Sequence, residues 1–133
     1  MSVTFGATVP ALPSADVARS AAFYRDRLGF EVVHEEDGFA VLRRDAARIH
    51  LWGSTDESWR ETLDAARPVR SGAESFIAGT ASCRIAVDGI DELYERCTAE
   101  GIVHPNGVLA DQWWGERDFT ILDPDGNAVA FFQ

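Results

Sequence analysis

The feature that most constrains the fold of this chain is an internal repeat. Residues 16–30 (DVARSAAFYRDRLGF) and 88–102 (DGIDELYERCTAEGI) align without a gap, and each segment runs from an aspartate to a glycine at the same spacing. An aspartate at the start of a helix accepts hydrogen bonds from free backbone N–H groups, and a glycine at its end adopts the left-handed conformation easily. The repeat therefore predicts two copies of one helix.

Each predicted helix carries one apolar face, because its apolar residues recur at helical spacing. These residues are Val17, Ala21, Tyr24 and Leu28 in the first copy, and Ile90, Leu93, Tyr94 and Cys97 in the second. We expect each face to pack against a sheet.

Strand-like runs flank both helices, one before and three after, which predicts an α+β fold of two βαβββ modules. The runs span residues 6–12, 30–35, 39–43 and 48–52 in the first module, and 82–87, 102–104, 118–122 and 128–132 in the second. We expect one domain over residues 1–133, with module one at about 1–53, an insertion at about 54–79 and module two at about 80–133. In the insertion, Ser54 and Glu57 resemble a capping box that opens a short helix.

Alternation along the strands indicates which side chains could line a site, since successive side chains point to opposite faces. In the run before the insertion, Ile49 and Leu51 share one face, whereas Arg48, His50 and Trp52 share the other. We expect the aliphatic face to pack on its helix and the mixed face to look into whatever cavity the sheet encloses.

The charge balance bears on the partners. With 22 acidic and 12 basic residues, the chain has a net charge of −10, which disfavours binding to nucleic acid and favours cations. Solubility alone is an alternative reason for this charge. No apolar run suits a membrane span or a secretion signal, and two cysteines are too few for a disulfide framework, so we expect a cytoplasmic protein.

The motif FYRDRLGF after the first strand and the motif DPDGN before the last, set in paired βαβββ modules, resemble the vicinal oxygen chelate (glyoxalase) superfamily. Within it, ALPSADVARSAAFYRDRLGF, the ASCRI strand and WGERDF look most like the bleomycin-resistance proteins. The resemblance implies a protein that binds and sequesters a glycopeptide antibiotic without altering it.

The superfamily's enzymes hold a metal ion at four inward positions, which the resemblance maps onto Val9, His50, Ser82 and Ala130. Catalytic divalent ions need about three ligands of the His, Asp, Glu or Cys type. We therefore predict no metal, no cofactor and no catalytic residues. The alternatives are a metal-dependent lyase, dioxygenase or thiol transferase of the same superfamily, and a regulatory or structural member without a small ligand.

The aromatic residues are the candidate ligand-binding groups. Trp113 and Trp114 are adjacent in a loop-like stretch that ends in a glycine, and neighbouring tryptophans rarely reach the same core, although core packing is the alternative. The resemblance places Trp114 and Phe39 in a drug-binding groove. His50, Trp52 and Ser82 complete the predicted set, while Trp59 is assigned to packing of the insertion.

A bleomycin-type antibiotic, free or as its metal complex, carries flat rings and a cationic tail, which suit stacking aromatics and an acidic groove. The acidic candidates, which the sequence does not rank, are Glu35, Glu36, Asp37, Asp111 and Glu116. The resemblance also implies a homodimer, often with an exchanged N-terminal strand. Pro10 and Pro13 are compatible with a crossing arm and equally with an ordinary loop.

Overall fold

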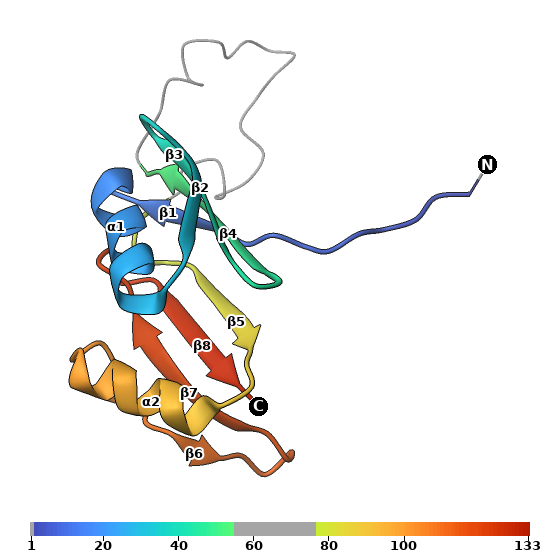
Figure 1. Cartoon of the computed structure of the whole chain (residues 1–133), viewed down its shortest axis with the longest axis vertical. Coiled ribbons are helices and arrows are strands. Elements are labelled where there is room, and N and C mark those ends of the chain that lie inside the picture. The colour runs from blue at the N-terminus through green and yellow to red at the C-terminus, as the bar shows by residue number, and fades with distance from the viewer. Residues whose placement is uncertain (1, 55–76) are drawn as a thin grey trace.

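The computed structural model describes residues 2–54 and 77–133. The first module contains β1 (Ala11–Ser14), α1 (Val17–Leu28), β2 (Glu31–Glu36), β3 (Phe39–Arg44) and β4 (Ala47–Gly53). The second contains β5 (Ser82–Ala86), α2 (Ile90–Ala99), β6 (Ala110–Asp111), β7 (Arg117–Leu122) and β8 (Ala128–Phe132). Figure 1 shows the modules one above the other, each with its helix on one side of its sheet.

The two sheets have the same topology. Their strand orders are β1-β4-β3-β2 and β5-β8-β7-β6. The strand before each helix pairs in parallel with the last strand of its module, and the other pairs are antiparallel. The repeat of two βαβββ units is thus confirmed. The residue limits of the modules and the insertion stay a prediction, and the expected helix after Ser54, with Trp59, lies outside the described residues.

The helix ends follow the repeat in the first copy and depart from it in the second. Asp16 caps α1 by accepting a hydrogen bond from the Arg19 N–H at 3.0 Å, and Gly29 ends the helix with a φ of 70°. The cap of α2 was expected at Asp88, but the N-cap residue is Gly89. The side-chain oxygen of Gln133 accepts hydrogen bonds from the N–H groups of Gly89 and Ile90, so a residue distant in sequence replaces the aspartate.

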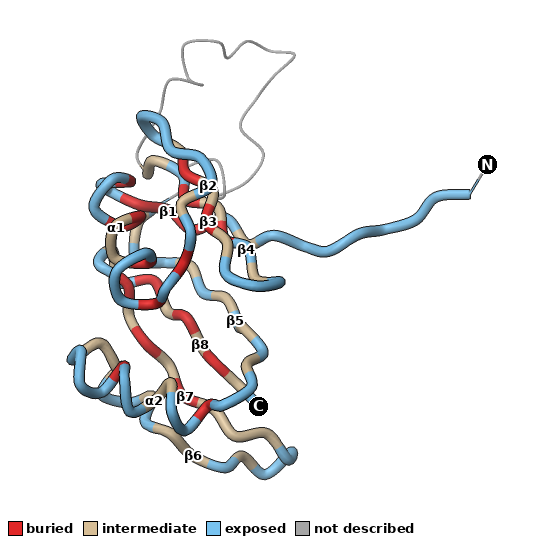
Figure 2. Tube along the Cα trace, in the orientation of Figure 1, coloured by how far each residue is buried: buried red, intermediate tan, exposed pale blue. Residues whose placement is uncertain are grey.

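Two strand predictions were wrong. The first strand begins at Ala11, rather than at residue 6, and residues 2–9 form an exposed arm that leaves the molecule (Figures 1 and 2). The run at residues 102–104 forms only an isolated bridge between Val103 and Ile121. The short strand β6 takes its place at the edge of the second sheet, where Ala110 and Asp111 pair with Asp118 and Arg117 of β7.

Alternation correctly predicted which face of β4 is buried, and β8 follows the same pattern. Ile49 and Leu51 of β4, and Val129 and Phe131 of β8, lie in the hydrophobic core with the helix faces. Figure 2 shows the buried positions alternating with partly exposed ones along the strands. The opposite face of each sheet is left open.

Among the described residues, neither helix is long and apolar enough to cross a bilayer.

The DPDGN turn, residues 123–127, joins the two modules. The Tyr24 hydroxyl of α1 donates to Asp123 Oδ2 at 2.9 Å, and the Ala15 N–H donates to Asp125 Oδ1 at 2.8 Å. The Asn127 side chain donates to the Pro13 carbonyl at 2.8 Å. Burial raises the pKa of Asp123, and burial together with the neighbouring Asp123 carboxylate raises the pKa of Tyr24. The turn therefore anchors α1 and the end of β1 to the second module.

Candidate functional site

An aromatic cluster occupies the open face of the first sheet. Its centre is Phe39 of β3, whose ring centroid lies 4.6 Å from that of Trp52 and 5.4 Å from that of His50. Both partners come from β4, the antiparallel neighbour of β3, on which Trp52 lies opposite Phe39 and His50 lies opposite Val41. His34 of β2 adds a fourth ring at 6.0 Å. Trp52 is 45% exposed, so the cluster presents aromatic surface to solvent.

A second aromatic pair lies in the tight turn between β6 and β7. The rings of Trp113 and Trp114 stand at 88° with their centroids 5.5 Å apart. The turn is closed by hydrogen bonds from the Gly115 N–H to the Gln112 carbonyl at 3.0 Å and from the Gln112 N–H to the Glu116 carbonyl at 2.7 Å. Trp113 is 92% exposed and Trp114 is 48% exposed, so core packing is not what holds either residue.

Arg84 lies on the open face of the second sheet, two residues after Ser82 on β5. Its guanidinium lies 4.3 Å from the ring centroid of Phe132 and donates to Glu116 Oε2 at 2.8 Å. A second carboxylate, Asp118 Oδ2, lies at 3.8 Å. Sequence reasoning did not select Arg84, although the alternation that places Ser82 on the open face places Arg84 there too.

Within one chain the predicted site residues form two separate groups. Phe39, His50 and Trp52 are brought together on the first sheet. Trp113 and Trp114 are adjacent in the β6–β7 turn, which Figure 1 places at the opposite end of the molecule from β3. Ser82 begins β5 and is exposed.

The acidic candidates differ in their pairing. Asp111 Oδ1 lies 3.1 Å from Arg117, and Glu116 is paired with Arg84. Glu36 lies 3.7 Å from His34, which is cationic only when protonated. These exposed pairs are each worth about 0–1 kcal/mol, so a cationic ligand can compete for the carboxylates at little cost.

The four positions that correspond to metal ligands hold a poor set of donors. His50 offers an imidazole and Ser82 a hydroxyl, whereas Ala130 has only a methyl group and Val9 lies outside β1. Such a set does not fit a catalytic divalent ion, which needs about three strong ligands. Within residues 2–54 and 77–133, no group of three or more His, Cys, Asp or Glu side chains is arranged to hold a metal.

The cysteines are free thiols, with Cys97 buried and Cys83 partly buried. Burial raises the pKa of each thiol to about 11, with a smaller contribution from Asp123 at Cys83 and from Glu100 at Cys97. Nucleophilic thiols have a lowered pKa, so these two have the character of packed apolar residues.

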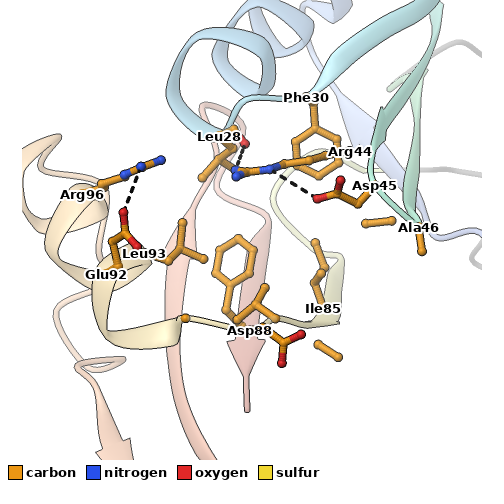
Figure 3. Close-up of a pocket in the computed structure, with 15 residues that line it drawn as sticks. Leu28, Phe30, Arg44, Asp45, Ala46, Ile85, Asp88, Glu92, Leu93 and Arg96 are labelled. Atoms are coloured by element: carbon orange, nitrogen blue, oxygen red, sulfur yellow. Dashed lines mark hydrogen bonds and ion pairs between the residues drawn. The ribbon is translucent and has the colours of Figure 1, made fainter.

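A cavity of about 460 Å³ lies between the two modules (Figure 3). Its lining is mixed: Leu28 and Phe30 of the first module and Ile85 of the second are apolar, whereas Arg44 and Arg96 are charged. Arg44 donates to the Leu28 carbonyl at 2.7 Å. All six predicted ligand-binding residues lie outside this lining, so the cavity is separate from the aromatic groups.

Comparison with known proteins gives consistent results. Residues 6–131 match the family model of the Glyoxalase/Bleomycin resistance protein/Dioxygenase superfamily. The chain is 59% identical over 126 residues to a bleomycin resistance protein of Geobacillus stearothermophilus, covering 95% of both chains.

Two solved structures share the fold. The bleomycin-binding protein of bleomycin-producing Streptomyces verticillus, complexed with copper(II)-bleomycin, has a TM-score of 0.70 and 27% identity, covering 98% of this chain and 97% of that one. A lactoylglutathione lyase from Agrobacterium tumefaciens has a TM-score of 0.71 and 25% identity, covering 95% and 92%. The fold therefore occurs in a binding protein and in an enzyme.

Proposed function

The chain belongs to the Glyoxalase/Bleomycin resistance protein/Dioxygenase superfamily, and from this premise we propose that it binds and sequesters a bleomycin-type glycopeptide antibiotic. The observation that carries the proposal is the 59% identity to a bleomycin resistance protein over 95% of both chains. The solved complex of a structural neighbour with copper(II)-bleomycin supports binding of the drug in its metal-loaded form as well.

The open aromatic faces suit the flat rings of such a drug. Phe39 is partly exposed beside Trp52 on the first sheet, and Trp114 is 48% exposed in the β6–β7 turn, so these rings are open to stacking on a ligand. Stacking on an aromatic side chain contributes roughly 1–3 kcal/mol per ring, by analogy with nucleic-acid bases. The net charge of −10 attracts the cationic tail and raises the rate of encounter at low salt.

We propose that each drug-binding groove is completed by a second copy of the chain. The two aromatic groups lie at opposite ends of one chain, so a ligand that contacts both needs the first module of one protomer and the second module of its partner. In the arm, Val3, Phe5, Ala7 and Val9 alternate as in a strand and are exposed. Such an apolar strand finds its partner at a sheet edge of the other protomer.

The groups available as metal ligands and nucleophiles support binding without chemical change of the ligand. The four positions that correspond to metal ligands supply one imidazole and one hydroxyl, and both thiols have raised pKa values. These residues therefore bind and orient a ligand but supply neither a metal site nor an activated nucleophile. We also propose a cytoplasmic location, where free thiols persist.

Calorimetry tests the proposed function. The wild-type protein is titrated with metal-free bleomycin and with copper-loaded bleomycin, and we expect saturable binding without turnover. The variant Trp114→Ala should bind about tenfold more weakly, which corresponds to a stacking contribution of about 1.4 kcal/mol. Thr98→Ala, a neutral truncation at an exposed position of α2, serves as the matched control. Absence of binding to both drug forms would refute the assignment, and drug modification would favour an enzyme.

A mixing experiment tests the shared groove. Phe39→Ala and Trp114→Ala chains are unfolded together, refolded, and the heterodimer is isolated by two different affinity tags at the C-terminus. If each groove takes Phe39 from one chain and Trp114 from the other, one groove carries both substitutions and the other carries none. We therefore expect one site of wild-type affinity per heterodimer. Two weakened sites, one lacking Phe39 and the other lacking Trp114, would show that each groove is formed within one chain.

A further inference from the structure

Arg84 is the residue of the open faces that the proposed function does not explain. A cation in a groove for a cationic ligand is unfavourable unless nearby carboxylates balance its charge. Glu116 and Asp118 provide this balance at 2.8 and 3.8 Å, and the group of three carries a net charge of −1. The local charge of the groove therefore stays negative although Arg84 lies in it.

The side chain of Arg84 crosses the sheet. Its own strand, β5, pairs with β8, and β8 pairs with β7, which carries Asp118. To reach the carboxylates, the guanidinium passes over the ring of Phe132 on β8, at 4.3 Å from its centroid. Packing of a guanidinium on an aromatic face fixes its plane and leaves fewer rotamers open.

Glu116 and Asp118 are each connected to one end of the turn between β6 and β7, residues 112–116. Glu116 follows Gly115 directly and ends the turn, and its backbone carbonyl accepts from the Gln112 N–H at 2.7 Å. Asp118 accepts from the Gln112 side chain at 2.8 Å, and Gln112 begins the turn. Through these contacts Arg84 connects the floor of the second sheet to both ends of the turn that carries Trp113 and Trp114.

We propose that Arg84 is a positioning residue that holds Trp114 in its ligand-binding orientation by fixing Glu116. The inference rests on the proposed function and deepens it, because it makes Glu116 a structural partner of Arg84 instead of a direct acceptor for the drug's cation. The two roles of Glu116 predict opposite effects when Arg84 is removed. If Arg84 fixes Glu116, its removal weakens binding. If Glu116 instead accepts the drug's cation, removal of Arg84 frees the carboxylate and strengthens binding.

The test combines affinity with a spectroscopic signal of the tryptophan pair. Two close, non-parallel indoles give a coupled circular dichroism signal, which depends on their mutual orientation. We expect Arg84→Met to weaken bleomycin binding by about three- to tenfold and to reduce this signal. Arg84→Lys should restore part of both, because it can still reach Glu116. Arg96→Met, which frees Glu92 on α2 and changes the net charge equally, is the control and should change neither.

A double-mutant cycle decides whether Arg84 acts through Glu116. Glu116→Gln should reproduce the effect of Arg84→Met, and the double variant should bind no more weakly than either single variant. Tighter binding by Arg84→Met, additive losses in the cycle, or an unchanged dichroism signal would each overturn the proposal. If the wild-type protein fails to bind bleomycin, the proposed function fails, while the dichroism signal still shows whether Arg84 orients the turn.

Discussion

The contact between α1 and the DPDGN turn allows a quantitative prediction for Tyr24→Phe. The substitution removes one hydroxyl from a fully buried ring and leaves its packing unchanged, including the edge-on contacts with Phe23 and Phe30 at 5.4 and 5.7 Å. The lost hydrogen bond is the one to Asp123 Oδ2 at 2.9 Å. A hydrogen bond to a charged group contributes about 1.5–3 kcal/mol.

Asp123 keeps its other donors in the variant, so the lower part of that range applies. Its Oδ1 still accepts from the Asp125 and Asn127 N–H groups at 2.9 Å, and its Oδ2 accepts from the Asn127 side chain at 3.1 Å. We expect a loss of about 2 kcal/mol in the free energy of unfolding at pH 7. For a chain of 133 residues this lowers Tm by roughly 6–9 °C, compared at equal protein concentration.

The pH dependence gives a second readout of the same bond. Burial raises the pKa of Asp123 above its unfolded value, whereas the Tyr24 hydroxyl acts to lower it, because it stabilises the ionised form. The contribution of Asp123 to stability is therefore full below the unfolded pKa and is lost as pH rises through the folded pKa. Tyr24→Phe raises that pKa further, so the deficit of the variant should shrink as the pH falls through the pKa of Asp123.

Urea unfolding of both proteins between pH 3 and pH 8, followed by circular dichroism, measures these effects. Tyr94→Phe is the matched control, because this second tyrosine packs edge-on to Phe119 at 5.1 Å and its hydroxyl has no hydrogen-bond partner among the described residues. We expect its loss to stay below about 0.5 kcal/mol. Equal losses in the two variants, or a deficit for Tyr24→Phe that grows toward acid pH, would refute the reasoning.

Three further predictions concern other parts of the molecule. The thiols of Cys83 and Cys97, with pKa values of about 11, should react slowly with a thiol reagent at pH 7.5 and quickly after unfolding, and fast labelling of the native protein would contradict the burial. Gly107→Ala should destabilise the protein by about 1–3 kcal/mol in urea unfolding, because a Cβ there lies 2.7 Å from the Thr120 Cβ. The raised pKa of Tyr24 predicts that the free energy of unfolding falls as the pH rises above 10, because the tyrosine ionises first in the unfolded chain. In urea unfolding above pH 10, the Tyr24→Phe protein should therefore lose less stability than the wild type.

Local signals in the sequence were sufficient where an element is determined by its own residues. The start and end of α1 follow from Asp16 and Gly29, which act within the helix itself. The buried faces of β4 and β8 follow from strict alternation along each strand.

Elements that depend on distant partners could not be predicted in the same way. The cap of α2 comes from Gln133, and nothing near Asp88 indicates this. The start of β1 depends on where β4 offers a partner, and the pairing of β1 begins with Ala11 opposite His50. Arg84 gains its role only when β8 brings β5 and β7 together, so the sequence motif WGERDF shows Glu116 and Asp118 but not what holds them.

The separation of the two aromatic groups has a consequence for gene dosage. If a groove exists only between two protomers, the number of functional sites rises with the square of the amount of chain while unassembled chains predominate. Halving expression then leaves about a quarter of the sites. Antibiotic tolerance would set in above a threshold of synthesis, and substitutions in the arm would shift that threshold while leaving every ring that touches the drug intact.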